Sequence, residues 1–249
     1  AALPLANLSN TYSQEAVSSI IETTTNFLEI LKKNKFNGKF IYTSSSMVYG
    51  EFNNKIVTEE SPTKPISIYG SAKLAGEIIT KGFCESFGLK YSIIRPSAVY
   101  GPTDVNRRVV QIFMENAFKG KKIVINGPQS KIDFTYIADL VQGYEKVINS
   151  SRSDNQIFNI TRGNARSLLD LAKTIQIYFP KIKILKKEHE KGVPKRGTLD
   201  ISKANELIGY SPENNLEVGY RKYINWYKEF SKKSVGFNQK GDFLPQSNE

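Results

Sequence analysis

Apolar positions along the chain follow two different periods. Over residues 14–34 and again over residues 67–87, apolar and β-branched side chains recur with the spacing of an amphipathic helix. Ser13 is a suitable N-cap for the first helix, and Gly88 is a suitable stop for the second. Short apolar runs over residues 39–44 and 91–95 are typical of strands buried in a parallel sheet. The pattern predicts an α/β protein.

The second half of the chain continues this alternation. It predicts helices over residues 106–119, 140–149, 167–178 and 216–230, and strands over residues 123–126 and 156–160. Ser167, with Asp170 three positions later, forms a good helix start. Trp226 reads as a core residue of the last helix rather than a ligand contact. The polar composition of residues 231–249 predicts a disordered tail.

Two groups of polar residues carry candidate chemistry. The strand over residues 39–44 ends in Ser44, Ser45 and Ser46, at the sheet edge where ligands bind in parallel folds. Tyr69 and Lys73 are spaced i and i+4, so they share one helix face. A neighbouring cation lowers the pKa of a phenol, and the pair can then act as a base. With 13 tyrosines in a lysine-rich chain, about one such Tyr/Lys spacing arises by chance. The alternative interpretation is that Lys73 is an exposed residue of an amphipathic helix.

Composition and charge narrow the class of protein. Apolar residues make up 39% and charged residues 24%, which is typical of a globular chain, and no apolar run is long enough to span a membrane. The formal net charge of +11 suggests nucleic-acid binding as one hypothesis. The lysines are spread among acidic residues, however, and we expect no nucleic-acid partner. With one cysteine, Cys84, and one histidine, we expect no disulfide, no metal site and a cytoplasmic location.

Several motifs together resemble a known family. The strand end at Ser44–Ser46, the sequence Val48-Tyr49-Gly50, the Tyr69/Lys73 pair and the run from Ile93 to Pro102 follow in that order. This set resembles the extended short-chain dehydrogenase/reductase family, specifically its nucleotide-sugar epimerases and dehydratases. The resemblance implies a partial Rossmann fold, a doubly wound parallel sheet without its first strands, with a smaller C-terminal α/β substrate lobe. Residues 1–104 and 133–160 would form the NAD(P)-binding domain, and residues 105–132 and 161–230 the lobe.

The resemblance also implies a catalytic set and a cofactor. Ser45, Tyr69 and Lys73 would be catalytic, and the cofactor would be NAD, with NADP not excluded. The cofactor contacts would be Ala1, Ala2, Thr43, Ser44, Tyr69, Lys73 and Pro96. The family's glycine-rich dinucleotide turn is not in this sequence, so we expect an amino-terminal truncation. We also expect that these 249 residues alone neither bind dinucleotide nor fold cooperatively.

The substrate implied by the resemblance is a nucleotide-diphosphate sugar. Its contacts would be Ser45, Ser46, Arg107, Val124, Asn126, Lys131 and Arg196. This chain departs from the family pattern at three contact positions. Ala98 replaces a common Asn, Ile132 replaces a common phosphate-binding Arg, and Ile20 replaces an Asn. Lys131 is a possible substitute for the missing Arg. Arg107 and Arg108 read equally well as solvated helix charges.

The residues after Ser45 discriminate between reactions. Ser46 and Met47 occupy the positions where 4,6-dehydratases carry an acid and a base, and neither side chain titrates near neutrality. This favours 4-epimerisation through a 4-keto intermediate. A reductase, a decarboxylase, a dehydratase or an inactive fragment without the cofactor-binding turn are the alternatives. The resemblance further implies a homodimer formed through the helices over residues 14–33 and 67–87.

Overall fold

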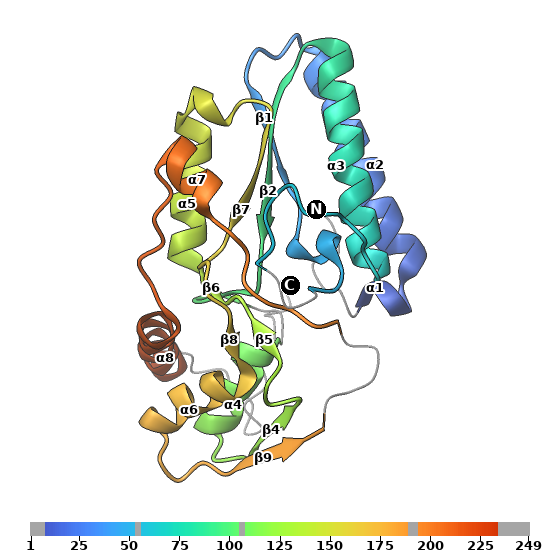
Figure 1. The fold of residues 1–249 in the computed structure, drawn as a ribbon. Coiled ribbons are helices and arrows are strands. Elements are labelled where there is room, and N and C mark those ends of the chain that lie inside the picture. Colours follow the sequence, from blue (N-terminus) through green and yellow to red (C-terminus); the bar gives the residue numbers. More distant parts are fainter. Residues whose placement is uncertain (1–7, 53–55, 105–107, 189–193, 234–249) are drawn as a thin grey trace.

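A three-stranded parallel sheet forms the centre of the larger part of the molecule. The computed structural model describes residues 8–52, 56–104, 108–188 and 194–233 (Figure 1). The strands β1 (Lys39–Thr43), β2 (Lys90–Pro96) and β7 (Gln156–Ile160) lie in the order β1-β2-β7. Thr43 pairs with Ile94, and Pro96 pairs with Ile160. The carboxyl ends of all three strands therefore meet at one edge.

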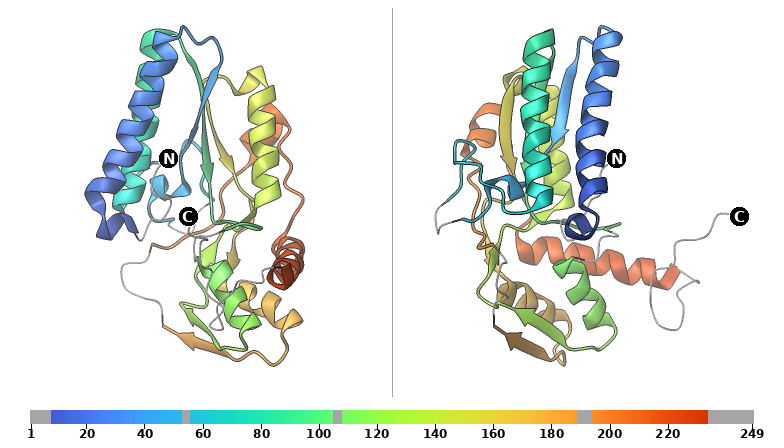
Figure 2. Two further views of the ribbon diagram at one scale, coloured as in Figure 1. Left: turned by 180° about the vertical axis from the view of Figure 1, so that it is seen from behind. Right: turned by 90° about the vertical axis from the view of Figure 1, so that its right-hand side faces the viewer.

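Helices cover both faces of this sheet. On one face lie α2 (Ser13–Lys33) and α3 (Ile68–Phe87), and on the other lie α5 (Ile137–Asn149) and α7 (Ser202–Ile208) (Figures 1 and 2). Neighbouring residues of β2 face opposite ways: Ile93 packs in the cluster of Leu28 and Cys84, whereas Ile94 packs in the cluster of Leu140 and Tyr210. This explains why the strand is a continuous apolar run.

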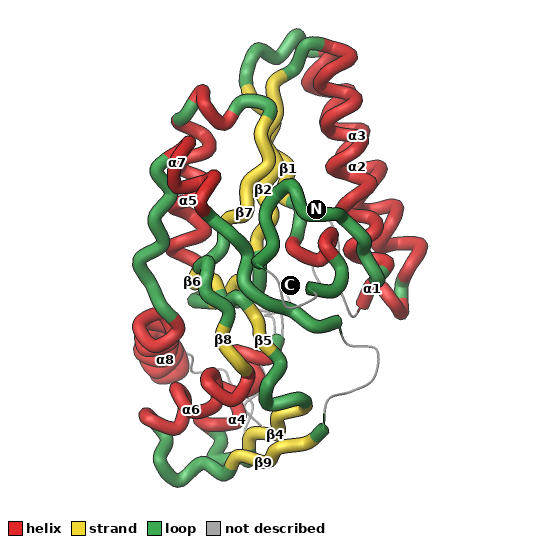
Figure 3. Tube along the Cα trace, viewed as in Figure 1, coloured by secondary structure: helices red, strands yellow, loops and turns green. Residues whose placement is uncertain are grey.

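The smaller lobe has its own apolar core. Its helices are α4 (Val109–Phe118), α6 (Leu168–Tyr178) and α8 (Leu216–Lys233), and its strands β4 (Ile123–Asn126) and β9 (Ile184–Lys187) pair in parallel (Figure 3). Met114, Leu171 and Tyr220 are fully buried between these elements. The remaining elements are α1 (Leu8–Thr11), η1 (Ser46–Tyr49), β3 (Val99–Tyr100), β5 (Lys131–Ile132), β6 (Thr135–Tyr136), η2 (Ser151–Ser153) and β8 (Arg166–Ser167).

Most elements lie where the sequence predicts them. Gly88 ends α3 in the left-handed conformation, Ser167 and Asp170 form a complete capping box, and Trp226 packs against the lobe core. One cap is wrong: Ser13 is already inside α2, and Tyr12 precedes it without a side-chain cap bond. The helix begins at Ser13 itself, one residue earlier than an N-cap at Ser13 would imply. Residue type indicates that a helix start is near but does not fix its exact position.

The ends of the predicted lobe also need correction. Helix α8 continues to Lys233, so residues 231–233 are helical rather than disordered, and residues 234–249 lie outside the described residues. Helix α7 falls in the range predicted for the lobe, yet Ala204 and Ile208 pack against α5 and β7 of the sheet. The chain thus returns to the sheet after β9. The apolar spacing of a short helix does not reveal which core it joins.

Two further features concern the described residues, 8–52, 56–104, 108–188 and 194–233. None of the helices in that part of the chain is long and apolar enough to cross a membrane. The same residues hold no group of three or more His, Cys, Asp or Glu side chains arranged to bind a metal ion.

Candidate active site

The predicted catalytic serine lies directly beyond the end of β1. Ser45 has extended backbone geometry and caps the short helix η1, where its Oγ accepts a hydrogen bond from the Met47 amide at 3.2 Å. Ser44 before it is only 2% exposed. The chain therefore leaves the sheet at a fixed turn, and the Ser45 side chain lies at the carboxyl edge of the sheet.

Helix α3 brings the predicted tyrosine and lysine to the same edge. Ser67 caps this helix by accepting from the Gly70 amide at 3.1 Å, which places Tyr69 in the first turn. Tyr69 shares a side-chain hydrogen bond with Ser45. The Lys73 Nζ donates to the Thr43 carbonyl at 2.9 Å and lies 5.8 Å from the centre of the Tyr69 ring. The structure thus brings the three predicted residues together.

Two glycines of α3 allow this close approach. A Cβ on Gly76 would lie 2.0 Å from the Tyr42 hydroxyl oxygen, and a Cβ on Gly70 would lie 2.7 Å from the Met47 carbonyl oxygen. Neither distance is possible for a real side chain. The helix face that carries Tyr69 can therefore pack directly onto β1 and the turn that follows it.

Electrostatics around the pair differ from the sequence prediction. The pKa of Tyr69 is raised above its usual 10.0 because burial disfavours the phenolate, although the Ser45 hydrogen bond and the charge of Arg108 act in the opposite direction. Lys73 is not among the groups that lower this pKa. Burial lowers the pKa of Lys73 itself to about 8. The expected depression of the phenol pKa by Lys73 is thus wrong for this structure, because burial outweighs a cation that bonds to Thr43.

A buried polar network, missed by the sequence reasoning, lies behind this site. Arg95 of β2 forms a two-pronged ion pair with Glu77 of α3, at 2.9 Å and 2.6 Å, and both side chains are almost fully buried. Arg95 also donates to the Tyr49 hydroxyl at 2.9 Å, and Tyr49 donates to Asn159 at 2.8 Å. Ser44 donates to Glu77. Glu77 lies one helical turn after Lys73, so the sequence alone could have placed it on the same helix face as Tyr69 and Lys73.

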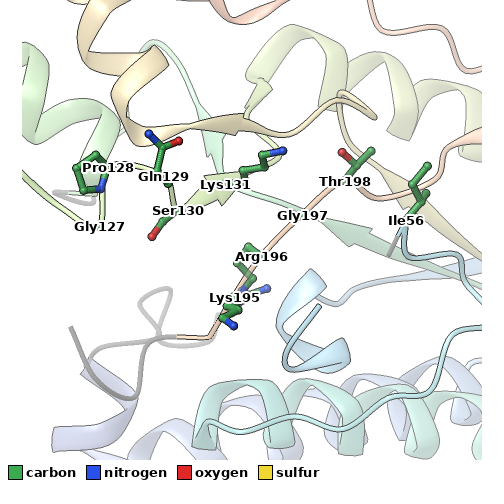
Figure 4. Close-up of a pocket in the computed structure, with 10 residues that line it drawn as sticks. All are labelled: Ile56, Gly127, Pro128, Gln129, Ser130, Lys131, Lys195, Arg196, Gly197 and Thr198. Carbon is green, nitrogen blue, oxygen red and sulfur yellow. The ribbon is translucent and has the colours of Figure 1, made fainter. Parts of the chain in front are cut away.

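An open pocket of about 710 Å³ lies between the two parts of the molecule (Figure 4). Three cations line it, Lys131, Lys195 and Arg196, and no acidic residue is among its described lining. Arg196 connects the pocket to the serine turn, because its Nη1 donates to the Ser46 carbonyl at 3.3 Å. Burial lowers the pKa of Arg196 to about 10. Lys195, which precedes Arg196, was not predicted as a contact, because lysines are frequent in this chain and nothing in the sequence distinguishes this one.

The other predicted contacts divide into three groups. Thr43, Ser44, Ser46 and Pro96 lie at the carboxyl edge of the sheet with the catalytic set. Val124 and Asn126 lie on β4, which leads into the pocket at Gly127, but they are not among its lining residues. Ala1, Ala2 and Arg107 lie outside the described residues.

The positions that depart from the family pattern have clear local structures. Ala98 adopts a positive φ of 36°, a conformation that asparagine tolerates better than alanine. Ile132 packs against the lobe core, so this position offers no cation. Lys131 beside it lines the pocket. Ile20 is buried in α2, and its carbonyl accepts from Thr24 at 2.7 Å.

Comparisons with known proteins show the family of the chain. Residues 1–161 match the model of the NAD dependent epimerase/dehydratase family. The chain is 31% identical to UDP-glucuronate 4-epimerase 1 of Arabidopsis thaliana, with 93% of this chain and 57% of that protein covered. It is 33% identical to a putative UDP-glucose 4-epimerase of Methanocaldococcus jannaschii, with 82% and 68% covered. The chain thus spans only part of these relatives.

Solved structures give the same result. A UDP-glucose 4-epimerase from Thermotoga maritima with UDP-glucose superposes with a TM-score of 0.87 at 28% identity, covering 93% of this chain and 76% of that chain. A UDP-glucuronic acid 4-epimerase from Bacillus cereus, in complex with UDP-glucuronic acid and NAD, superposes with a TM-score of 0.83 at 28% identity, covering 92% and 74%.

Proposed function

The chain belongs to the NAD dependent epimerase/dehydratase family, and from this premise we propose that it carries the acid-base centre of a nucleotide-sugar 4-epimerase. The observation that carries the proposal is the meeting of Ser45, Tyr69 and Lys73 at one sheet edge. A phenol, a hydroxyl and an ammonium within one site can remove and return the proton of a sugar hydroxyl.

Each of the three side chains has a role in this scheme. Tyr69 takes the proton of the sugar 4-hydroxyl, and Ser45 hydrogen-bonds the same oxygen as it becomes a carbonyl. The 4-keto sugar then turns, and the proton returns from Tyr69 when the opposite face is reduced. Burial raises the pKa of Tyr69, and the Ser45 hydrogen bond and the charge of Arg108 are the groups that favour its phenolate.

The residues at this edge fit the nicotinamide cofactor of the family. The Lys73 ammonium, which is only partly buried, donates to the Thr43 carbonyl and has further donors for ribose hydroxyls. Thr43, Ser44, Tyr69 and Pro96 would complete the contacts, with Ala1 and Ala2 as further proposed ones. Bound NAD would supply the hydride acceptor and donor for the sugar carbon. The residues do not distinguish NAD from NADP.

The cationic pocket is the proposed site of the nucleotide diphosphate. Lys131, Lys195 and Arg196 provide positive charge for two phosphates without competing acids in the described lining. Val124, Asn126 and Arg107 remain proposed contacts for the nucleotide. Ser46 extends the site toward the sugar, since its carbonyl is bonded to Arg196.

Epimerisation is favoured over dehydration by the turn after Ser45. Ser46 and Met47 offer no group that can protonate a leaving hydroxyl or remove a carbon-bound proton near neutral pH.

The remaining parts of the proposal concern assembly and location. Exposed apolar residues on the outer helices, Phe27 and Ile30 of α2 and Ile78 of α3, support a homodimer through these two helices. The single cysteine, Cys84, is buried and without a disulfide, which supports a cytoplasmic location. No nucleic-acid or membrane partner is proposed.

The test is an epimer interconversion assay. The protein is used in a form that carries the family's glycine-rich dinucleotide turn, and it is incubated with NAD and with UDP-glucose or UDP-glucuronate. The sugar is followed by proton NMR while the absorbance of reduced nicotinamide is recorded. We expect equilibration of the two C4 epimers with no net change in nicotinamide. Stoichiometric consumption of reduced cofactor would instead indicate a reductase, and loss of water or carbon dioxide would indicate the other family reactions.

A further inference from the structure

One face of α3 contacts the end of β1 through three successive helical turns. Tyr69 bonds to Ser45, the Lys73 Nζ donates to the Thr43 carbonyl, and Glu77 accepts from the Ser44 hydroxyl. These three contacts fix the rotation of the helix and its height along the strand, and we name them the ladder. Two rungs involve predicted catalytic residues, and the third involves Glu77.

The third contact of the ladder, between Ser44 and Glu77, lies in the protein interior. Glu77 is held by Arg95 of the neighbouring strand β2 through both carboxylate oxygens, at 2.9 Å and 2.6 Å. Arg95 in turn donates to Tyr49 at 2.9 Å and to the Glu59 carbonyl at 3.2 Å. A bidentate buried pair allows little movement of either side chain. The ladder is therefore tied to the sheet as well as to the serine turn.

We infer that Glu77 is a positioning residue, which holds Ser44 and Arg95 and thereby sets the Tyr69–Ser45 hydrogen bond. The inference rests on the proposed function, since it concerns the same acid-base centre, and it adds a residue that touches neither substrate nor reacting atoms. Loss of the Glu77 rung lets α3 rotate or slide against β1. Displacement of about 1 Å at a reacting group reduces turnover by up to about 100-fold.

The expected pH effect follows from the groups around each side chain. Glu77 faces Arg95 from β2, Tyr49 from η1 and Tyr42 from β1. Tyr69 faces Ser45, Lys73 and the charge of Arg108. The Ser45 bond lowers the pKa of Tyr69, so weakening that bond raises this pKa. The ascending limb of the pH–rate profile then moves to higher pH.

The experiment compares Ser44→Ala, Glu77→Gln and the double variant Glu77→Gln with Arg95→Gln, which leaves no unpaired charge. The matched control is Ser92→Ala on β2, which removes the buried hydrogen bond that the Ser92 hydroxyl donates to the Ser153 carbonyl of η2 at 2.6 Å. We expect kcat to fall about 10-fold for Ser44→Ala and about 100-fold for the Glu77 variants, with KM unchanged and the ascending limb shifted upward. The control should stay within about two-fold of the parent.

A second readout needs no substrate. Tyrosine labelled with ¹³C reports the titration of Tyr69, identified by its loss in Tyr69→Phe, in each folded variant. An upward shift of this titration in Ser44→Ala and the double variant, absent from Ser92→Ala, supports the inference. Titration and pH profiles identical to the control would overturn it. If the parent protein epimerises no sugar nucleotide, the proposed function fails, and the Tyr69 titration still decides the role of Glu77.

Discussion

The sheet edge and the cationic pocket use polar side chains in opposite ways. At the sheet edge, Glu77 and Arg95 are almost fully buried and bonded to each other, and the reacting groups stand on elements that they connect. In the pocket, Lys131 and Lys195 are exposed to solvent. Buried partners cost desolvation but fix geometry, whereas exposed cations attract anions with little demand on geometry. Under the proposed function, catalysis would depend on the first arrangement and binding on the second.

The largest expected effect comes from breaking the buried pair. Arg95→Leu leaves the Glu77 carboxylate buried without a cation, and we expect the free energy of unfolding to fall by about 3–5 kcal/mol. The control is Lys90→Met on the same strand, because the Lys90 side chain is 57% exposed and its ammonium pairs with Asp154 at 2.8 Å. That change should cost under about 1 kcal/mol. Urea unfolding of both variants measures the difference, and equal losses would contradict the contrast between buried and exposed pairs.

A second buried acid gives a pH-dependent prediction. Burial raises the pKa of Asp133 to about 6 from its usual 3.8, against hydrogen bonds from Thr161 and the Leu199 amide. Its folded form binds the proton more tightly, so stability from this group is present below pH 4 and is lost as the pH rises to about 6. The loss amounts to about 3 kcal/mol. Unfolding measured across this range should show the slope, and Asp133→Asn should remove it.

The control for that slope has the opposite sign. Hydrogen bonds from Lys39 and Lys90 hold the pKa of Asp154 below its usual value. Stability from Asp154 is therefore present above the usual carboxyl pKa and is lost as the pH falls. Asp154→Asn should therefore reduce the loss of stability on the acid side of the pH–stability profile. If Asp154→Asn and Asp133→Asn changed the slope of this profile in the same direction, the assignment would be contradicted.

Removing a pocket cation should have a smaller effect. Lys131→Met should weaken binding of uridine diphosphate by about 5-fold at low salt, and the difference should shrink as salt is added, because the ammonium is exposed. Lys186→Met on β9 is the control, since Lys186 is exposed but outside the pocket lining. Titration calorimetry at two salt concentrations measures both. Equal losses would indicate a general field rather than a site.

The smallest effect concerns backbone strain beside the site. Ala98 holds a φ of 36°, which glycine adopts more easily. Ala98→Gly should therefore raise the free energy of unfolding by about 0.5 kcal/mol, after the larger entropy of unfolded glycine is deducted. Ala117→Gly within α4 should instead cost about 1 kcal/mol. Thermal unfolding distinguishes the two signs.

Local spacing made most of the fold, and the proximity of the three proposed catalytic residues, predictable from the sequence. Tyr69 and Lys73 lie one helical turn apart, and Ser45 follows a strand, so each position is fixed by its neighbours in the chain. The Glu77–Arg95 pair was not predicted, because its partners lie on different elements and each alone resembles a surface charge. The predicted direction of the Tyr69 pKa shift was wrong for a related reason. Burial of the phenol raises this pKa, and burial depends on how all the neighbouring elements pack.

The most direct test of the acid-base centre is the turnover of Tyr69→Phe compared with its affinity for the nucleotide sugar. The change removes the phenol oxygen that bonds Ser45 and leaves the ring and the cationic pocket intact. We predict that turnover falls by about 1,000-fold while the dissociation constant changes by less than about two-fold. Turnover close to that of the parent protein would contradict the account.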